Sequence, residues 1–506
     1  MKAAVIGSGM AGILAAIELK KAGIDVVVFE KASRLGGTWR DNSYPGLSCD
    51  VPAHSYTFSF ARNPEWSQHY APGPEIREYF ERVADEFGIT SCIRFNSEVV
   101  SLVWEDTGWK LETNDGFVGE FPYVFAATGV LHHPNVPEFD GIEDFGGAVF
   151  HSARWDHSVP LDGKKVAVVG TGSTAVQITS ALVDSVSEFS LFQRSAQWVL
   201  PAPNPEFSDE ERAEFRSDPE AHEEYVRELA ITMFQRTSSA VTELNSIEHQ
   251  KIAALCRRNL STVVDNDLRE RLTPDYEPMC KRLIVSPDFY EKVQRPHVQL
   301  VTSGIDRFTP TGIRTNDGTE YEFDVIVLST GFRSDRFIRP TRVIGVDHVD
   351  LDDVWSPAPL AYLSVMVPGF PNLFMLNGPN GPIGNFSLIE IAERQMSYCM
   401  QLISELGRSG AKAVAPTAEA TEAFEDERRA AAQNTIWMSG CNSWYLDATG
   451  VPASWTFSYD RFVDEMNAPD LSAFLLSYLD PSSPAQPHQR TINEIPVLLG
   501  NSFATG

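Results

Sequence analysis

The chain opens with the stretch KAAVIGSGMAGILAAIELKKAGIDVVVFE at residues 2–30. An apolar run at 2–6 leads into a glycine-rich turn, a helical pattern follows at 13–21, and a second β-type run lies at 25–29. Strand, glycine turn, helix and strand in this order are typical of the Rossmann βαβ unit. The N-terminus therefore predicts a dinucleotide-binding fold.

The turn itself has the pattern GxGxxG, with glycines at Gly7, Gly9 and Gly12. The first permits the tight turn, the second lets backbone N–H groups approach a pyrophosphate, and the third lets helix and strand pack closely. Glu30 ends the second strand, where it can accept hydrogen bonds from the ribose hydroxyls of an adenosine. Because a carboxylate there repels a 2′-phosphate, this first site fits FAD or NAD and not NADP.

The same pattern returns in the middle of the chain. A strand-like run at 165–169 is followed by Gly170, Gly172 and Ser173, then by a helical pattern and a further strand at 189–192. The chain therefore carries a second nucleotide-binding unit.

This second unit ends its strand in Gln193-Arg194-Ser195, where an NAD site would place an acidic residue. Arg194 can offer a bidentate fork to a phosphate and Ser195 a hydroxyl, which favours NADP, although an exposed arginine in a salt bridge is the competing interpretation. Two such units in one chain predict electron transfer from NADPH to a bound flavin.

The rest of the chain completes an α/β fold of two Rossmann-like dinucleotide-binding domains, for FAD and NADP, with a helical insertion. Charged helical sequence fills 205–275, strand-like character returns at 298–301 and 324–328, and a glycine-rich loop precedes a helix that begins near Leu388. We predict the following division: 1–142, FAD-binding domain, first part; 143–204, NADP-binding domain, first part; 205–275, helical insertion; 276–370, NADP-binding domain, second part; 371–506, FAD-binding domain, second part, with a C-terminal arm around 481–487.

Composition excludes several functions. The 506 residues carry 41 Lys and Arg against 69 Asp and Glu, a net charge of −28, so the surface should repel nucleic acid and anionic membranes. The six cysteines form no CxxC pair, which argues against a zinc site or the close dithiol of a disulfide reductase and fits a reducing compartment. We expect a cytoplasmic protein with no metal site and no membrane insertion; the oligomeric state stays open.

Two longer motifs are more specific than either glycine turn. Residues 36–50 read GGTWRDNSYPGLSCD and match GGxWxxxxYPGxxxD, and residues 145–156 read FGGAVFHSARWD and match FxGxxxHxxxWD. Together they resemble the two fingerprints of the Baeyer-Villiger monooxygenases, in class B of the flavoprotein monooxygenases. The resemblance extends over nearly the whole chain.

The resemblance implies an enzyme in which NADPH reduces FAD, O2 adds at flavin C4a, and the resulting peroxyflavin converts a ketone to an ester or lactone. It also implies roles for particular residues. Arg282 would be the active-site arginine beside the flavin, and Asp50 would fix its orientation, although by itself an aspartate after a Pro-Gly turn is usually a loop cap. Lys281 would reach the 2′-phosphate of NADP.

Further residues follow from the same resemblance. Trp39 and Trp444 match positions near the flavin and the nicotinamide, and Gly37 and Asn380 lie in cofactor-facing motifs. His151 lies between the two units, where a hinge or packing role competes with a catalytic one.

Two alternatives stay open. A flavin-containing monooxygenase that oxygenates nitrogen or sulfur resembles the same pattern, but usually has Tyr or Phe at the position of Trp155. A nucleotide-binding redox sensor without turnover is the other, and the presence of Asp50, Lys281 and Arg282 argues against it.

Overall fold

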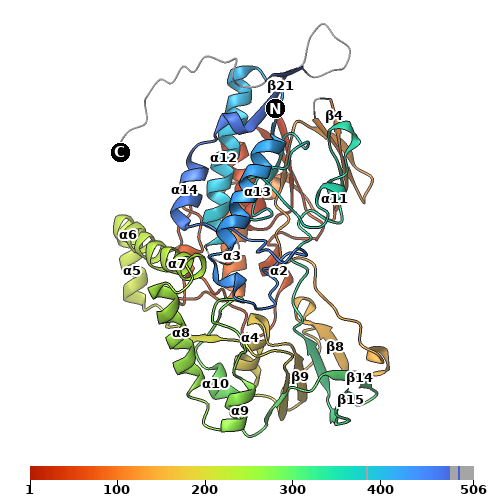
Figure 1. The fold of residues 1–506 in the computed structure, drawn as a ribbon, viewed down its shortest axis with the longest axis vertical. Helices are drawn as coiled ribbons and strands as arrows, with labels where there is room; N and C mark the ends of the chain where they lie inside the picture. Colours follow the sequence, from red (N-terminus) through yellow and green to blue (C-terminus); the bar gives the residue numbers. More distant parts are fainter. Residues whose placement is uncertain (107, 383, 385, 479–487, 491–506) are drawn as a thin grey trace.

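The computed structural model of the protein describes residues 1–106, 108–382, 384, 386–478 and 488–490. The expected C-terminal arm around 481–487 lies outside the described residues. Figure 1 shows an elongated molecule in which one parallel sheet lies in the upper half and a second in the lower half. This confirms the prediction of two Rossmann-like units.

The first sheet has five parallel strands in the order β19-β7-β1-β2-β3. Its strands are β1 (Lys2–Ile6), β2 (Asp25–Phe29), β3 (Ile93–Arg94), β7 (Tyr123–Ala126) and β19 (Leu373–Met375). Successive residues of β1 alternate between two separate cores, because Ala3 and Val5 pack on one face and Ala4 and Ile6 on the other. A parallel sheet buried on both faces explains why β1 and β2 read as continuous apolar runs.

Helices of both chain ends cover this sheet. They are α1 (Met10–Lys21), α2 (Thr38–Asp41), α3 (Gly73–Glu86), α12 (Leu388–Ser409), α13 (Ala418–Ala432) and α14 (Tyr459–Asn467). Helix α12 begins at Leu388, as the sequence predicts, and packs against α1. The last part of the chain therefore completes the unit that the first part begins.

The second sheet has five parallel strands in the order β13-β10-β9-β17-β8. Its strands are β8 (Ala148–His151), β9 (Lys165–Val169), β10 (Glu188–Phe192), β13 (Val298–Val301) and β17 (Val325–Leu328), and helix α4 (Ser173–Leu182) follows the second glycine turn. Smaller sheets are formed by β4 (Val99–Glu105), β5 (Gly108–Thr113), β6 (Val118–Phe121) and β18 (Arg342–Ile344); by β11 (Val199–Pro201) and β12 (Ile284–Ser286); by β14 (Ile305–Thr309), β15 (Gly312–Thr315) and β16 (Glu320–Glu322); and by β20 (Ala413–Pro416), β21 (Phe474–Tyr478) and β22 (His488–Arg490).

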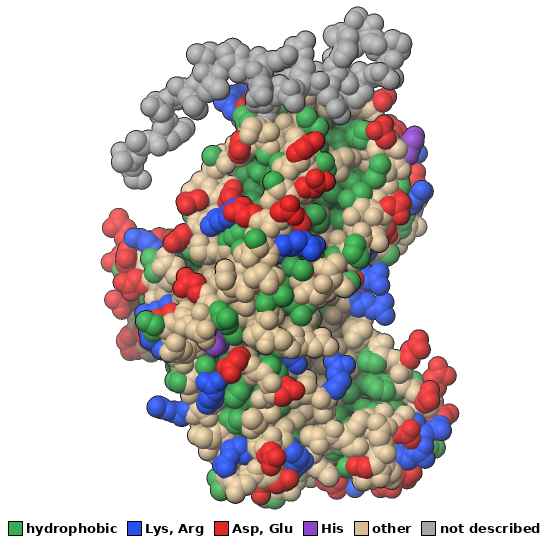
Figure 2. All heavy atoms as spheres, viewed as in Figure 1, with side chains coloured by type: hydrophobic (Ala, Val, Ile, Leu, Met, Phe, Trp, Pro, Cys, Tyr) green, Lys and Arg blue, Asp and Glu red, His purple; other side chains and the backbone are tan. Residues whose placement is uncertain are grey.

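Short helices fill the stretch between the strands β11 and β12. They are α5 (Asp209–Ser217), α6 (Pro219–Ala230), the π-turn η5 (Ile231–Gln235), α7 (Arg236–Thr242), α8 (Ile247–Leu260) and α9 (Asn266–Arg271). Figure 2 shows acidic side chains along the edge formed by α5 and α6. A buried hydrogen bond of 2.7 Å between His54 Nδ1 and His222 Nε2 joins α6 to the loop that follows Asp50.

One covalent link was not anticipated. Cys280 and Cys441, which are 161 residues apart in the sequence, form a disulfide, whereas Cys49, Cys92, Cys256 and Cys399 are free. Within the described residues, no helix combines the length and the apolar composition needed to cross a lipid bilayer.

Candidate functional site

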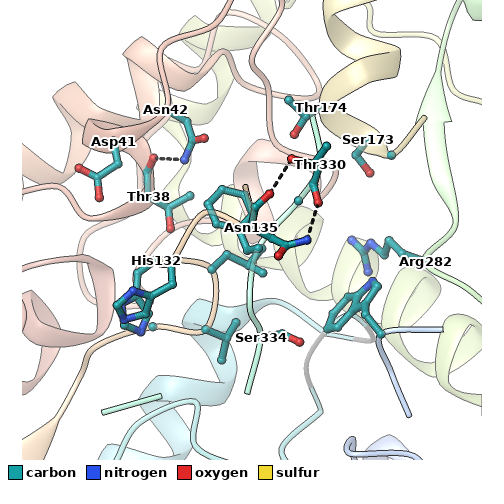
Figure 3. Close-up of a pocket in the computed structure, with 18 of the residues that line it drawn as sticks. Thr38, Asp41, Asn42, His132, Asn135, Ser173, Thr174, Arg282, Thr330 and Ser334 are labelled. Atoms are coloured by element: carbon teal, nitrogen blue, oxygen red, sulfur yellow. Dashed lines mark hydrogen bonds between the residues drawn. The ribbon is translucent and has the colours of Figure 1, made fainter. Parts of the chain in front are cut away.

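A cavity of about 1170 Å³ lies between the two nucleotide-binding units. Figure 3 shows Thr38 and His132 on one side of it and Ser173 and Arg282 on the other. Most of the residues singled out in the sequence line this one cavity: Gly7, Gly9, Glu30, Gly37, Trp39, Asp50, Gly170, Gly172, Ser173, Arg194, Ser195, Lys281, Arg282 and Trp444. The fold thus brings both glycine turns and both ends of the first fingerprint, 36–50, to a common space.

At the first glycine turn, the backbones of Gly9 and Gly37 approach each other closely, and no side chain fills the space beside them. A Cβ on Gly37 would lie 2.9 Å from Gly9 Cα, so no larger residue fits at this position without a shift. Gly9 precedes α1 as its N-cap residue and supplies no side chain to the free N–H groups of the first helical turn. A pyrophosphate can accept from these groups and is favoured by the helix dipole. The cradle therefore fits the diphosphate of FAD.

Glu30 has more partners than the sequence indicates. Its Oε2 accepts from Ser8 N at 2.9 Å and from Ser8 Oγ at 2.7 Å, and its Oε1 accepts from Ala32 N at 2.9 Å and lies 3.0 Å from Arg40 Nη1. A carboxylate offers about four acceptor sites, so a ribose hydroxyl must share an oxygen with one of these donors. Arg40, inside the first fingerprint, was missed as a partner of this carboxylate.

The second nucleotide unit gathers two cations and a hydroxyl. Lys281 Nζ lies 3.5 Å from Ser195 Oγ, and Arg194 lines the same part of the cavity. Burial lowers the pKa of Lys281; Asp275 acts in the opposite direction and the like charge of Arg194 in the same one. A phosphate dianion would offset the repulsion between the charges of Arg194 and Lys281 and accept hydrogen bonds from both and from Ser195. These three residues therefore fit the 2′-phosphate of NADP.

Arg282 and Asp50 come from different units and meet at the cavity. Asp50 Oδ2 accepts from Arg282 Nη2 at 2.5 Å and from Nε at 3.2 Å, and Arg282 Nη1 donates to the carbonyl of Gly384. The carboxylate raises the pKa of Arg282 further above its ordinary value, against the opposing effect of burial. The guanidinium therefore stays charged and is fixed in orientation.

Sequence reasoning missed the joint between the two units. Tyr44 Oη donates to Gln177 Oε1 at 2.8 Å, and Gln177 Nε2 donates to Ser48 O at 3.1 Å. A Cβ on Gly46, whose φ is +80°, would lie 2.6 Å from Gln177 O. The YPG segment of the first fingerprint, Tyr44 to Gly46, therefore contacts α4 of the second unit. In the sequence, this contact was indicated only by the glycine that follows Tyr44 and Pro45.

Three predicted residues lie outside the cavity lining. Gly12 packs behind the turn, where a Cβ would lie 1.9 Å from Gly7 O. Asn380 is buried and its Oδ1 accepts from Ala361 N at 3.2 Å. His151 Nδ1 accepts from Ala153 N at 3.1 Å, and burial lowers the pKa of its imidazole.

The two predicted tryptophans do line the cavity. Trp39 donates to Tyr56 Oη at 3.2 Å, and Trp444 has 45% of its surface exposed.

Comparisons with known proteins identify the family of this chain. Residues 4–210 match the family described as pyridine nucleotide-disulphide oxidoreductase. An uncharacterized monooxygenase of Mycobacterium tuberculosis is 47% identical over 434 residues, which cover 85% of this chain and 87% of that protein. A Baeyer-Villiger monooxygenase of Streptomyces coelicolor is 38% identical over 487 residues, which cover 94% of this chain and 92% of that protein.

A solved structure of OTEMO in complex with FAD and NADP has a TM-score of 0.84 and 26% sequence identity, and the match covers 94% of this chain and 99% of that one. The protein described here is a flavin-dependent monooxygenase. It belongs to the Baeyer-Villiger monooxygenase family of the class B flavoprotein monooxygenases.

Proposed function

We propose that this protein holds FAD and NADPH and converts a ketone to an ester or lactone. The reaction balances as ketone, O2, NADPH and a proton giving ester, water and NADP+. The observation that carries the proposal is Arg282, charged and oriented by Asp50, at the cavity between two nucleotide cradles. When bound, FAD supplies the electron storage and the O2 activation that no side chain can supply.

The two cradles differ in the nucleotide they suit. The first, with Glu30 and the opposed Gly9 and Gly37, suits FAD, and the second, with Arg194 and Lys281, suits NADPH. We extend this to the domain division, in which 1–142 and 371–506 form the FAD-binding domain, 143–204 and 276–370 the NADP-binding domain, and 205–275 the helical insertion.

Arg282 stabilises negative charge on oxygen during the attack on a ketone. At about 4 Å and an effective dielectric near 20, one full charge is worth about 4 kcal/mol, or roughly three pKa units. The guanidinium has five N–H donors. Among the described residues, Asp50 accepts from two of these N–H groups and the carbonyl of Gly384 from a third, which leaves two to be shared between Tyr445 and the cavity.

Two further residues complete the proposal. Trp444, whose exposed indole lines the cavity, covers the nicotinamide and helps to exclude water. His151 lies behind the cavity wall, at the end of β8, and acts on the position of the second sheet rather than on the reacting atoms.

The decisive experiment is a ketone and thioether panel under isotopically labelled O2, with product mass as the readout. We expect one labelled oxygen in an ester or lactone. Arg282→Ala should abolish its formation, whereas Arg314→Ala, on β15 and paired with Asp306 of β14, should leave it unchanged. Labelled sulfoxide without any ester would refute the ketone assignment and favour a heteroatom oxygenase.

A further inference from the structure

Tyr445 lies in direct contact with Arg282 and is not explained by nucleotide binding. Its side chain is 4% exposed, and its hydroxyl lies close enough to the Arg282 guanidinium to act, after burial and Asp50, on the pKa of that group, which it raises. The ring contacts two indoles, with centroid separations of 5.2 Å to Trp437 and 4.2 Å to Trp444. A buried phenol with these two ring contacts has little freedom to move away from the guanidinium.

Gly384 shows how closely the two groups approach. A Cβ at this residue would lie 2.2 Å from Tyr445 Oη and 3.2 Å from Arg282 Nη1, so both atoms pack over the same α-carbon. Its φ of +88° also favours glycine. The carbonyl of Gly384 accepts from Arg282 Nη1. Asp50, Gly384 and Tyr445 thus hold the guanidinium from three segments of the chain.

The Cys280–Cys441 disulfide ties one of these segments, the one with Tyr445, to the segment that carries Arg282. Cys280 lies two positions before Arg282, and Cys441 lies four positions before Tyr445. The Cα atoms of the two cysteines are 6.2 Å apart, and both residues are buried. The bond therefore fixes the loop that carries Trp444 and Tyr445 to the segment that carries Arg282.

We propose that Tyr445 is a positioning residue for Arg282 and that the Cys280–Cys441 disulfide holds it in place, so that the site is complete only while this cysteine pair is oxidised. A dithiol would open the bond by thiol–disulfide exchange: the protein disulfide takes up two electrons and two protons, and the dithiol becomes a cyclic disulfide. Reduction frees the loop while Asp50 still contacts the guanidinium. This inference rests on the proposed role of Arg282.

The first test counts thiols and needs no turnover. Protein isolated without reductant is alkylated in denaturant and weighed by mass spectrometry. Four alkylated cysteines are expected before reduction and six after it, because Cys49, Cys92, Cys256 and Cys399 are free. Six alkylated cysteines without reduction would overturn the covalent part of the inference.

The second test measures the limiting rate of ester formation from a saturating ketone of the panel, the step in which Arg282 acts, and records anaerobic bleaching of the flavin by NADPH as a separate measurement. Tyr445→Phe keeps the ring and removes only the hydroxyl. Loss of a hydrogen bond to a charged group should lower the limiting rate of ester formation about tenfold, while the half-saturating NADPH concentration and the Tm stay constant. Tyr290→Phe, in the second unit, is the matched control and should form ester at the wild-type rate.

The disulfide and the hydroxyl should act through the same guanidinium. Cys441→Ser, or wild type treated with dithiothreitol, should show the same tenfold loss, and adding Tyr445→Phe should lower the rate little further. Cys399→Ser, on α12, should have no effect. An unchanged rate in Tyr445→Phe, or losses that multiply in the double variant, would overturn the inference. A wild type whose flavin NADPH does not bleach would instead contradict the proposed function.

Discussion

The choice between NADPH and NADH can be tested at two residues, Arg194 and Lys281. Both line the second nucleotide cradle, and Lys281 Nζ lies 3.5 Å from Ser195 Oγ. Arg194→Ala and Lys281→Ala each remove one cation from the site proposed for the 2′-phosphate. NADH has no phosphate there, so its binding should not depend on either side chain.

The size of the effect follows from the type of contact. A hydrogen bond to a charged group contributes about 1.5–3 kcal/mol. Each substitution should therefore raise the KM for NADPH about ten- to hundredfold and leave the KM for NADH within twofold. The assay is steady-state coenzyme oxidation with each coenzyme in turn. Lys251→Ala, an exposed lysine paired with Glu248 on α8, serves as the control and should change neither value.

Two outcomes would refute the reasoning. If both KM values rose together, the residues would shape the loop without contacting a phosphate. If the preference between the coenzymes stayed as in the wild type in the double variant, the 2′-phosphate would bind elsewhere.

Three other predictions concern a titrating lysine, the first glycine turn and the histidine pair. Since burial lowers the pKa of Lys281, the lysine loses its charge, and the KM for NADPH should start to rise, at a lower pH than with an ordinary lysine. Lys281→Arg keeps the charge and should make the KM for NADPH nearly independent of pH over this range. The same pH dependence in this variant as in the wild type would contradict the prediction. Gly12→Ala should yield protein without yellow flavin, because the new Cβ would lie 1.9 Å from Gly7 O; full flavin absorbance would show that the turn can shift. Burial, followed by the like charge of His222, lowers the pKa of His54 to about 3, so the folded state favours the neutral histidine pair. The Tm should therefore fall as the pH drops from about 6.5 toward 3. His222→Gln should make the Tm depend less steeply on pH, and the same dependence as in the wild type would place its cause elsewhere.

The sequence predicts the secondary structure around the nucleotide cradles well. The strands expected at 2–6, 25–29, 165–169 and 298–301 form with these bounds. The first three have apolar interiors because they are flanked by strands of a parallel sheet that is buried on both faces. The fourth lies at a sheet edge and keeps an exposed Gln299. The helix predicted at 13–21 in fact begins at Met10, since the glycine turn itself supplies the first helical N–H groups. Most of the site residues chosen from the motifs therefore do line the cavity.

Contacts between distant segments were beyond sequence reasoning. The Cys280–Cys441 bond depends on the path of the 161 positions that separate the two residues, and a spacing rule such as CxxC cannot detect it. The partners of Glu30 and the approach of Tyr445 to Arg282 over Gly384 likewise depend on how loops fold over one another. The cytoplasmic location stays a prediction.

The contact between the YPG turn and α4 makes the two nucleotide sites mechanically dependent. Helix α4 begins at Ser173, beside the second glycine turn, and Gln177, one turn later, is hydrogen-bonded to Tyr44 and Ser48. Two residues beyond Ser48 comes Asp50. If binding of a nucleotide displaced α4, this turn would carry the shift to the carboxylate that orients the guanidinium. By thermodynamic reciprocity, a change at this carboxylate would then alter how tightly the second nucleotide is held.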